Sequence, residues 1–178
     1  MEVRKGTRTP ELRLAPLSRR HLDATLQWVN RPELKHFTGT LFPVSRNGHG
    51  AWFRRLQNDP LRRWFAIEAA GVHVGNTGIK HLDAANRCAE LFIYVGDPQN
   101  RGRGLGVQAT RQLTAMCFGP LALHRVFAQV FAFNTPALAS YMRAGFVQEA
   151  RLRGHYFHGG RWHDQIVLSQ LIHGIHEF

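Results

Sequence analysis

A glycine-rich loop near the middle of the chain carries the residues that most clearly indicate a binding function. The loop consists of Arg101, Gly102, Arg103, Gly104, Leu105 and Gly106. Glycine lets the backbone approach a ligand closely, and the free N–H groups at the start of a helix attract phosphate oxygens. Residues 91–95 before the loop are rich in β-forming side chains, and residues 107–116 after it have helix-compatible spacing. The segment predicts an anion-binding loop between a strand and a helix, although a simple turn has a similar sequence.

The composition also points to an anionic partner. The 178 residues carry a net charge of +11, with 23 lysines and arginines against 12 aspartates and glutamates. The arginines are spread over the whole chain, which favours a generally basic surface over a dedicated nucleic-acid site. An anionic cofactor or a nucleotide-linked substrate also accounts for this charge.

The length of the chain fits one domain, which we place at residues 11–178 behind a basic flexible tail at residues 1–10. The two cysteines, Cys88 and Cys117, form no metal-binding pair and indicate a reducing compartment. No apolar stretch is long enough to cross a bilayer. We therefore expect a cytoplasmic protein with no membrane partner.

Hydrophobic spacing predicts one mixed α/β domain. Strands are expected at residues 11–17, 64–68, 72–79, 88–95, 125–133, 146–152 and 165–172, and helices at 19–30, 45–57, 107–116 and 137–143. Ser18 is expected to cap the first helix and Thr135 the last, and Leu22, Leu26 and Val29 to form the buried face of the first. The resulting order, βααβββαβαββ, begins with a run of strands, which argues against a doubly wound Rossmann sheet.

Two motifs within this order resemble those of the GNAT superfamily of acyl-CoA-dependent N-acyltransferases. They are Arg101-x-x-Gly104-x-Gly106, between the fourth strand and the next helix, and Asn134-x-x-Ala137-x-x-x-Tyr141-x-x-x-Gly145-Phe146. The resemblance covers about residues 11–172 and is shared with groups that act on ribosomal proteins and on nucleotide-linked amino sugars. The loop also fits the register Gln99-x-x-Gly102-x-Gly104, but the later register places Gly106 at the start of the helix.

The resemblance implies acetyl-CoA as the acyl donor. Backbone N–H groups of residues 101–106 are then expected to grip the pyrophosphate of CoA, with arginine side chains adding charge. The fourth and fifth strands are expected to splay apart, so that the pantetheine arm bonds to the backbone of Phe92, Ile93 and Tyr94. One N–H group there polarises the thioester carbonyl. Asn134 is expected to contact the same arm, or alternatively to cap the next turn.

The resemblance further implies direct transfer in a ternary complex, in which the amine loses a proton and the thiolate of CoA gains one. Tyr141 stands where the family places its general acid, although a core tyrosine also fits. Glu90 matches a glutamate of the ribosomal-protein group and is our candidate base through water, or it only pairs with a neighbouring arginine. Some relatives carry glutamate where this chain has Gln129, and an amide cannot accept the proton. Weaker candidate bases are His73, His81 and His155.

The expected acceptor is the primary amine of a small molecule, with an amino sugar or a nucleotide-linked metabolite favoured. Its pocket is expected to include Trp28, Phe37, His81 and Tyr156. The main alternative is the N-terminal amine of a ribosomal protein, and an alternative of another class is a non-catalytic CoA- or nucleic-acid-binding regulator. His155, His158 and His163 lack the spacing of a metal site, so no metal is expected. Analogy with relatives suggests a homodimer.

Overall fold

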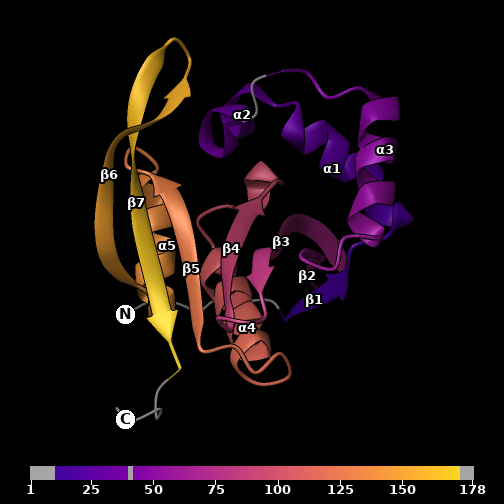
Figure 1. Cartoon of the computed structure of the whole chain (residues 1–178). Coiled ribbons are helices and arrows are strands. Elements are labelled where there is room, and N and C mark those ends of the chain that lie inside the picture. The colour runs from indigo at the N-terminus through magenta and orange to yellow at the C-terminus, as the bar shows by residue number, and fades with distance from the viewer. Residues whose placement is uncertain (1–10, 40–41, 173–178) are drawn as a thin grey trace, which may run out of the picture.

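The fold is built around a seven-stranded sheet in the computed structural model, which describes residues 11–39 and 42–172 (Figure 1). The strands are β1 (Leu12–Pro16), β2 (Arg63–Ala69), β3 (Val72–Asp83), β4 (Cys88–Val95), β5 (Arg125–Phe131), β6 (Val147–His158) and β7 (Arg161–Leu171). The helices are α1 (Leu22–Val29), α2 (Pro32–Thr38), α3 (Arg46–Gln57), α4 (Leu105–Phe118) and α5 (Thr135–Ala144). Short 3-10 turns at Arg19–His21 and Pro98–Asn100 precede α1 and the glycine-rich loop. The tail predicted at residues 1–10 lies outside the described residues.

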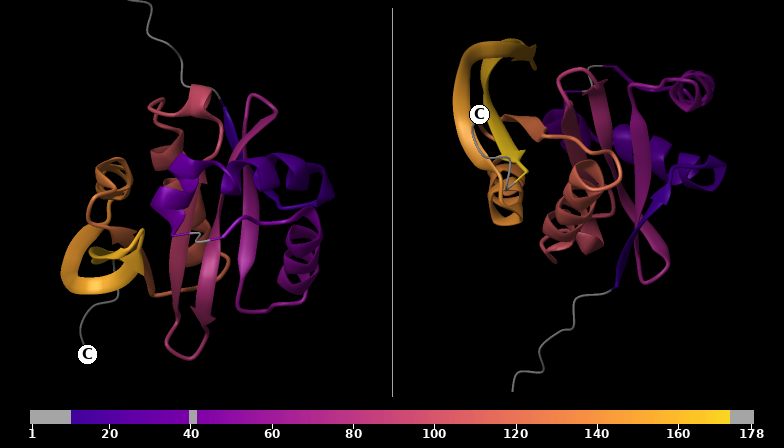
Figure 2. Two further views of the ribbon diagram at one scale, coloured as in Figure 1. Left: turned by 90° about the horizontal axis from the view of Figure 1, so that it is seen from above. Right: turned by 60° about the horizontal axis from the view of Figure 1, so that its bottom comes forward.

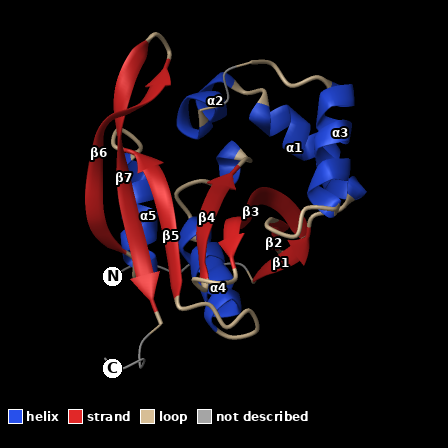
Figure 3. Ribbon diagram, viewed as in Figure 1, coloured by secondary structure: helices blue, strands red, loops and turns tan. Residues whose placement is uncertain are grey.

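Two neighbouring strands of the sheet, β4 and β5, run parallel, and they pair over a short length. The strand order is β1-β2-β3-β4-β5-β7-β6, and neighbours are antiparallel except for β4 and β5. Cys88, Ala89 and Glu90 pair with Arg125, Val126 and Phe127. Within the described residues no pairing continues beyond Glu90, so the two strands diverge from there (Figure 3). The mixed α/β class and the splayed fourth and fifth strands predicted from the sequence are confirmed.

Helices cover the two faces of the sheet differently. α4 and α5 lie side by side on one face, where Leu113 of α4 and Tyr141 of α5 join the main apolar core (Figure 2). α1 covers the other face of β3 with a partly polar contact. There Thr25 Oγ1 accepts a hydrogen bond from Asn76 Nδ2 at 3.0 Å, and both side chains are fully buried. Because α4 packs into the main apolar core, the start of α4 is held in place, and with it the glycine-rich loop that leads into this helix.

The segment between the first two predicted helices contains a further helix, α2, which the sequence analysis missed. Pro32 occupies its first turn, and Gly39 follows its last residue in the left-handed conformation, at φ 72°. With 7 residues, α2 has too few turns to present a periodic apolar stripe. The order is therefore βαααβββαβαββ, with one helix more than predicted.

The predicted cap of the last helix was wrong by one residue. Asn134, and not Thr135, caps α5, because its Oδ1 accepts a hydrogen bond from the backbone N–H of Ala137 at 3.2 Å. Ser18 does precede the first helical segment, and its backbone N–H donates to Nδ1 of His21 at 3.0 Å. Where two adjacent residues can both cap a helix, as Asn134 and Thr135 can, the sequence does not decide at which of them the helix begins.

The buried face of α1 also differs from the prediction. Thr25 and Trp28 are its buried residues, whereas Leu22, Leu26 and Val29 are only half-buried. The reason is that α1 packs on a layer containing Asn76 and His73, so a small hydroxyl and an indole fit better than an aliphatic stripe.

The strand boundaries follow the prediction with three differences. β3 continues to Asp83, past the predicted end at residue 79, and β5 ends at Phe131. β6 and β7 run to the Gly159-Gly160 turn and form a long hairpin that projects beside α2 in Figure 1. No helix among the described residues is long and apolar enough to cross a membrane.

Candidate active site

A cavity of about 540 Å³ opens where β4 and β5 separate. Aromatic side chains form much of its wall, namely Phe37, Trp64, Phe92, Tyr94, Phe131, Tyr141 and Tyr156. The other lining residues are Val29, Thr38, Lys80, Glu90, Leu91, Ile93, Gln129, Val130, Asn134, Ala137, His155 and Gln165. The cavity thus brings together residues from both halves of the chain, including the two candidates for acid and base.

The glycine-rich loop presents a series of free backbone donors. Gly102 and Gly104 adopt left-handed conformations, with φ of 72° and 77°, and Gly104 caps α4. The N–H groups of residues 102–107 have no partner in the described part of the chain, since the first bond of the helix runs from the N–H of Gln108 to the carbonyl of Gly104. The later donors belong to the positive end of α4. This geometry fits an anion with several oxygens, such as a pyrophosphate.

The two arginines of the loop have different surroundings. Arg101 donates from Nε to the carbonyl of Val95 at 3.0 Å and from Nη2 to that of Gly96 at 3.3 Å. Its side chain therefore ties the loop to the end of β4. Arg103 is exposed, and its Nη1 donates to Oδ1 of Asn100 at 3.2 Å. Arg103 is the cation better placed to meet an incoming phosphate.

The open edge of β4 borders the cavity through Phe92, Ile93 and Tyr94. Thr77 Oγ1 donates to the carbonyl of Phe92 at 2.7 Å, and Asn76 Nδ2 donates to the hydroxyl of Tyr94 at 2.6 Å. Burial raises the pKa of the Tyr94 hydroxyl, which therefore stays neutral. β3 holds this part of β4 from one side, and the side toward β5 is free to pair with an extended ligand.

Asn134 combines the two roles that the sequence left open. Its Oδ1 caps α5, as described above, and the residue also lines the cavity. Its Nδ2 group has no partner in the described part of the chain and can donate to a ligand in the splayed region.

Tyr141 reaches the cavity from the buried face of α5. Its side chain is 3% exposed, and its hydroxyl donates to the carbonyl of Leu91 at 3.4 Å. Burial and the negative charge of Glu90 raise the pKa of this hydroxyl. The phenol therefore keeps its proton near neutral pH, as a proton donor must.

Glu90 is a buried carboxylate held by two basic side chains. Lys80 Nζ lies 2.9 Å from its Oε1, and His81 Nδ1 lies 2.9 Å from its Oε2. The residue is 7% exposed and lines the cavity. The alternative reading from sequence, an arginine partner, is wrong, because a lysine and a histidine occupy that position.

Two of the predicted acceptor residues, Phe37 and Tyr156, line the cavity. Tyr156 donates to the carbonyl of Gly39 at 3.2 Å, and its ring meets that of Phe131 edge to face with centroids 5.0 Å apart. These contacts fix the ring of Tyr156 between α2 and the sheet, at the wall opposite β4.

The other predicted acceptor residues lie elsewhere. Trp28 is 5% exposed and packs against Gly96, where a Cβ atom would come within 2.0 Å of the indole. It therefore supports the end of β4 and is absent from the cavity wall. His81 contacts Glu90 but is not itself a lining residue. Among the weaker bases, His155 lines the cavity, whereas His73 is half-buried, is not a lining residue, and hydrogen-bonds to Oδ1 of Asn76 at 2.9 Å.

Several lining residues were missed by the sequence analysis, among them Lys80, Trp64 and Gln165. Lys80 follows the predicted end of its strand, so its position opposite Glu90 could not be read from the pattern. Trp64 and Gln165 lie on strands that were predicted, but only the sheet order places those strands around one cavity. No group of three or more potential metal ligands occurs among the described residues.

Comparison with known proteins gives consistent matches along the chain. Residues 11–147 match the model of the family described as "Acetyltransferase (GNAT) domain". An uncharacterised N-acetyltransferase derived from the SPbeta prophage of Bacillus subtilis is 28% identical over 137 residues, which is 76% of each chain. The spermidine N(1)-acetyltransferase of Vibrio cholerae is 28% identical over 108 residues, covering 60% of this chain and 62% of that protein. A putative ribosomal N-acetyltransferase of Bacillus subtilis is 30% identical over 101 residues, covering 57% and 55%.

The fold also matches solved structures. A spermidine N-acetyltransferase from Vibrio cholerae, crystallised with CoA and spermine, superposes with a TM-score of 0.83 at 23% identity, over 90% of this chain and 95% of that one. Two of these names, both from Vibrio cholerae, refer to spermidine, and one refers to a ribosomal N-acetyltransferase. They give no support to the predicted preference for an amino sugar or a nucleotide-linked acceptor.

Proposed function

Because this chain belongs to the GNAT acetyltransferase family and is an acetyl-CoA-dependent N-acetyltransferase, we propose that its acceptor is a small molecule with one primary amine on an uncharged, largely apolar body. The family is one of enzymes, so a non-catalytic regulator is not retained. The single observation that carries the acceptor class is the composition of the cavity wall.

The cavity wall offers little negative charge. Glu90 is its only carboxylate among the described lining residues, and Lys80 contacts that carboxylate directly. A polyamine carries several ammonium groups, and each needs its own acceptor or water when it enters a cavity. Aromatic rings, by contrast, form much of the wall and favour contact with one apolar face of a ligand. These features support a monoamine over a polycation.

The glycine-rich loop and the free edge of β4 support binding of the donor. The unpaired N–H groups of residues 102–107 and the exposed Arg103 suit the pyrophosphate of CoA. Acetyl-CoA supplies the activated thioester when bound. The free edge at Phe92, Ile93 and Tyr94 supports pairing with the pantetheine arm, and a backbone donor there would stabilise the developing oxyanion.

In the proposed mechanism Glu90 accepts a proton from the ammonium group of the acceptor, directly or through one water molecule. The neutral amine then attacks the thioester carbonyl carbon, a C–N bond forms, and the C–S bond breaks. Tyr141, whose buried hydroxyl is protonated, donates its proton to the leaving sulfur and regains one from the acylated nitrogen, which loses its second proton, so that the amide, the free thiol of CoA and protonated Glu90 result. Asn134 orients the donor through Nδ2.

The test is thiol release from acetyl-CoA with a panel of amines. The panel contains an aromatic monoamine, an amino sugar, spermidine and a short peptide with a free N-terminus. We expect the aromatic monoamine to have the highest kcat/KM. A higher value for spermidine or for the peptide would overturn the proposed acceptor class, and a higher value for the amino sugar would restore the preference read from the sequence.

A further inference from the structure

An irregularity in the pairing of β3 with β4 brings two consecutive side chains to one carboxylate. Lys80 pairs with Glu90, and the next pair in register is Asp83 with Cys88. Two residues of β3, residues 81 and 82, therefore stand opposite one residue of β4, which is a β-bulge. Consecutive residues of a regular strand point to opposite faces. The bulge removes this restriction, so that both Lys80 and His81 reach Glu90.

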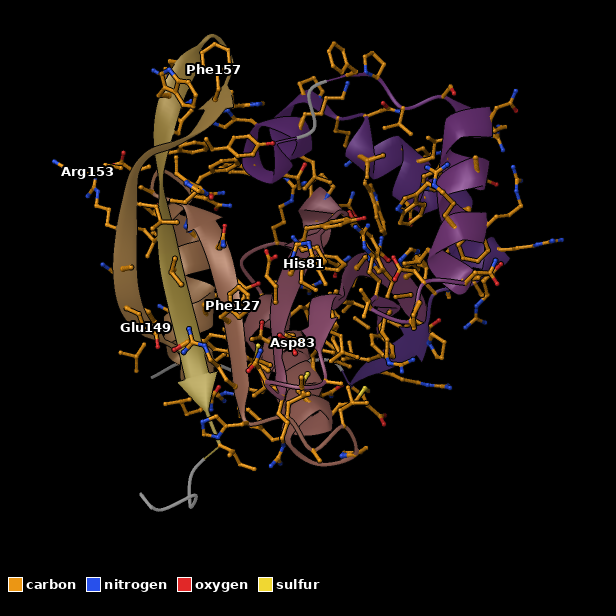
Figure 4. All side chains as sticks on the ribbon, in the orientation of Figure 1. His81, Asp83, Phe127, Glu149, Arg153 and Phe157 are labelled. Atoms are coloured by element: carbon orange, nitrogen blue, oxygen red, sulfur yellow. The ribbon has the colours of Figure 1, made fainter. Side chains whose placement is uncertain are left out.

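The bulge holds His81 in a backbone conformation that is uncommon for residues other than glycine. Its φ is 50°, in the left-handed region. The side chain of His81 is 66% exposed, whereas that of Glu90 is 9% exposed. An exposed imidazole gains little stability from one ion pair with a carboxylate. The conformation belongs to the bulge, and its consequence is that the imidazole reaches the carboxylate of Glu90. Figure 4 labels His81 on β3 and Phe127 on β5, the strands on either side of Glu90 on β4.

We propose that His81 is a positioning residue that orients the carboxylate of Glu90 and controls, through its own charge, the ability of Glu90 to take a proton from the acceptor. This inference rests on the role of Glu90 in the proposed function. Nδ1–H of His81 bonds one carboxylate oxygen and Lys80 bonds the other, so the plane of the carboxylate is fixed and its remaining lone pairs are left for the cavity.

The charge of His81 then acts as a switch on the base. A neutral imidazole can donate the hydrogen bond from Nδ1 without adding charge. An imidazolium donates the same bond and adds a positive charge 2.9 Å from Oε2, which disfavours protonation of Glu90. The other titratable groups that line the cavity are Lys80, Tyr94, Tyr141, His155 and Tyr156. Of these, only His155 is another imidazole, so it provides the necessary comparison.

The decisive variant is His81→Asn. Asparagine tolerates the left-handed conformation and donates a hydrogen bond, but it carries no charge at any pH. With the wild-type protein we expect kcat to rise with pH as the His81 imidazole loses its charge. His81→Asn should keep kcat at high pH within about threefold and should lose this rise. His81→Ala, which removes the bond as well, should lower kcat roughly tenfold or more at every pH.

Three control variants separate this role from others. His155→Asn should leave the rise of kcat with pH in place, because that imidazole has no contact with Glu90 among the described residues. Lys80→Gln should lower kcat but also preserve the rise. Ala70→Asn changes another residue with positive φ, 49° in the turn between β2 and β3, and should leave the pH profile unchanged.

The outcomes distinguish the inference from the proposed function. If His81→Asn keeps the rise of kcat with pH, or if His81→Ala is as active as the wild type, the role of His81 is wrong. Glu90→Gln tests the base itself and should abolish most of the activity. If Glu90→Gln remains fully active, the assignment of the base fails and the inference fails with it, whereas the acceptor class is still decided by the amine panel.

Discussion

Tyr141 illustrates how burial can prepare one side chain for chemistry. A phenol in water loses its proton near pH 10, and removal from water raises that value because the phenolate is poorly solvated. In this protein the nearby charge of Glu90 acts in the same direction. This supports the proposed role of Tyr141 as an acid that holds its proton until the sulfur leaves.

We expect Tyr141→Phe to lower kcat by about 10²- to 10⁴-fold, the range found for loss of a general acid. The hydroxyl makes one long hydrogen bond, to Leu91, so its removal should leave the core and donor binding intact. The check combines steady-state kinetics with calorimetric titration of CoA into the variant. Undiminished kcat, or a parallel loss of CoA affinity, would contradict the role of acid.

Individual residues of the site were predictable where a motif fixes them. Tyr141 and Asn134, which were named from the family motif, line the cavity, whereas the loop glycines are not among its lining residues. Lys80 and His81 reach Glu90 only through a bulge, and a one-residue irregularity leaves no periodic trace in the sequence. Trp28 failed as an acceptor residue because burial against Gly96 depends on the packing of α1, which the sequence pattern misjudged.

At the scale of elements, three strands are joined by one polar cluster at the edge of the sheet. Arg125 of β5 donates to Glu149 of β6 at 2.7 Å, and Ser169 of β7 donates to the same carboxylate. The β6–β7 hairpin lies at the edge of the sheet and β6 is mostly exposed, so this cluster adds fixed contacts where apolar burial is low. Hydrogen bonds from Arg125 and Ser169 lower the pKa of Glu149 to about 2.

This lowered pKa gives a stability prediction with a definite sign. A carboxyl group with a depressed pKa in the folded state stabilises the protein above its unfolded-state value, here 4.5, and that contribution is lost as pH falls toward about 2. Glu149→Gln should therefore lower the urea midpoint at pH 7, and the difference from wild type should shrink between pH 4.5 and 2. The exposed Glu33→Gln is the control. A difference that stays constant with pH would mean that Glu149 acts through packing alone.

The contact between α4 and α5 depends on a glycine at the start of α4. A Cβ atom on Gly106 would lie 2.9 Å from Oγ of Ser140 on α5. Gly106→Ala should therefore force the Ser140 side chain out of its present rotamer and lower the thermal midpoint, despite the better helix propensity of alanine. Combining it with Ser140→Ala removes the clashing atom and should restore most of the loss. If the double variant is no more stable than Gly106→Ala, the close approach is not the reason for this glycine.

Helices and strands were predicted correctly where the apolar pattern extends over several turns or a whole strand. The prediction failed where a few residues determine whether a helix forms or where it begins. α3, α4 and the strands of the β2–β3 hairpin were recognisable from spacing and turn residues. α2 was missed because a helix of 7 residues has no repeated stripe, and the cap of α5 was displaced because Asn134 and Thr135 can both cap. Tertiary contacts, which a single sequence does not display, decide both cases.

At the scale of the whole molecule, the net charge of +11 acts in opposite directions on the two substrates. CoA is polyanionic, so a basic protein attracts it, while a protonated amine is repelled until it reaches Glu90. These long-range effects are screened by salt, because the Debye length falls from about 10 Å at 0.1 M to about 3 Å at 1 M ionic strength. The net charge therefore helps acetyl-CoA to bind and hinders binding of the amine, which favours binding of the donor before the acceptor.

We accordingly expect added salt to weaken CoA binding and to strengthen binding of a cationic acceptor. Raising sodium chloride from 0.1 to 1 M should increase the Kd of CoA several-fold, measured by calorimetry, and should lower the KM of the amine at saturating acetyl-CoA. In Arg103→Gln the salt dependence of CoA binding should be smaller, because one exposed cation beside the free N–H groups is gone. If both constants rise with salt, general charge does not govern substrate capture, and the local contacts of the loop and of Glu90 must account for it alone.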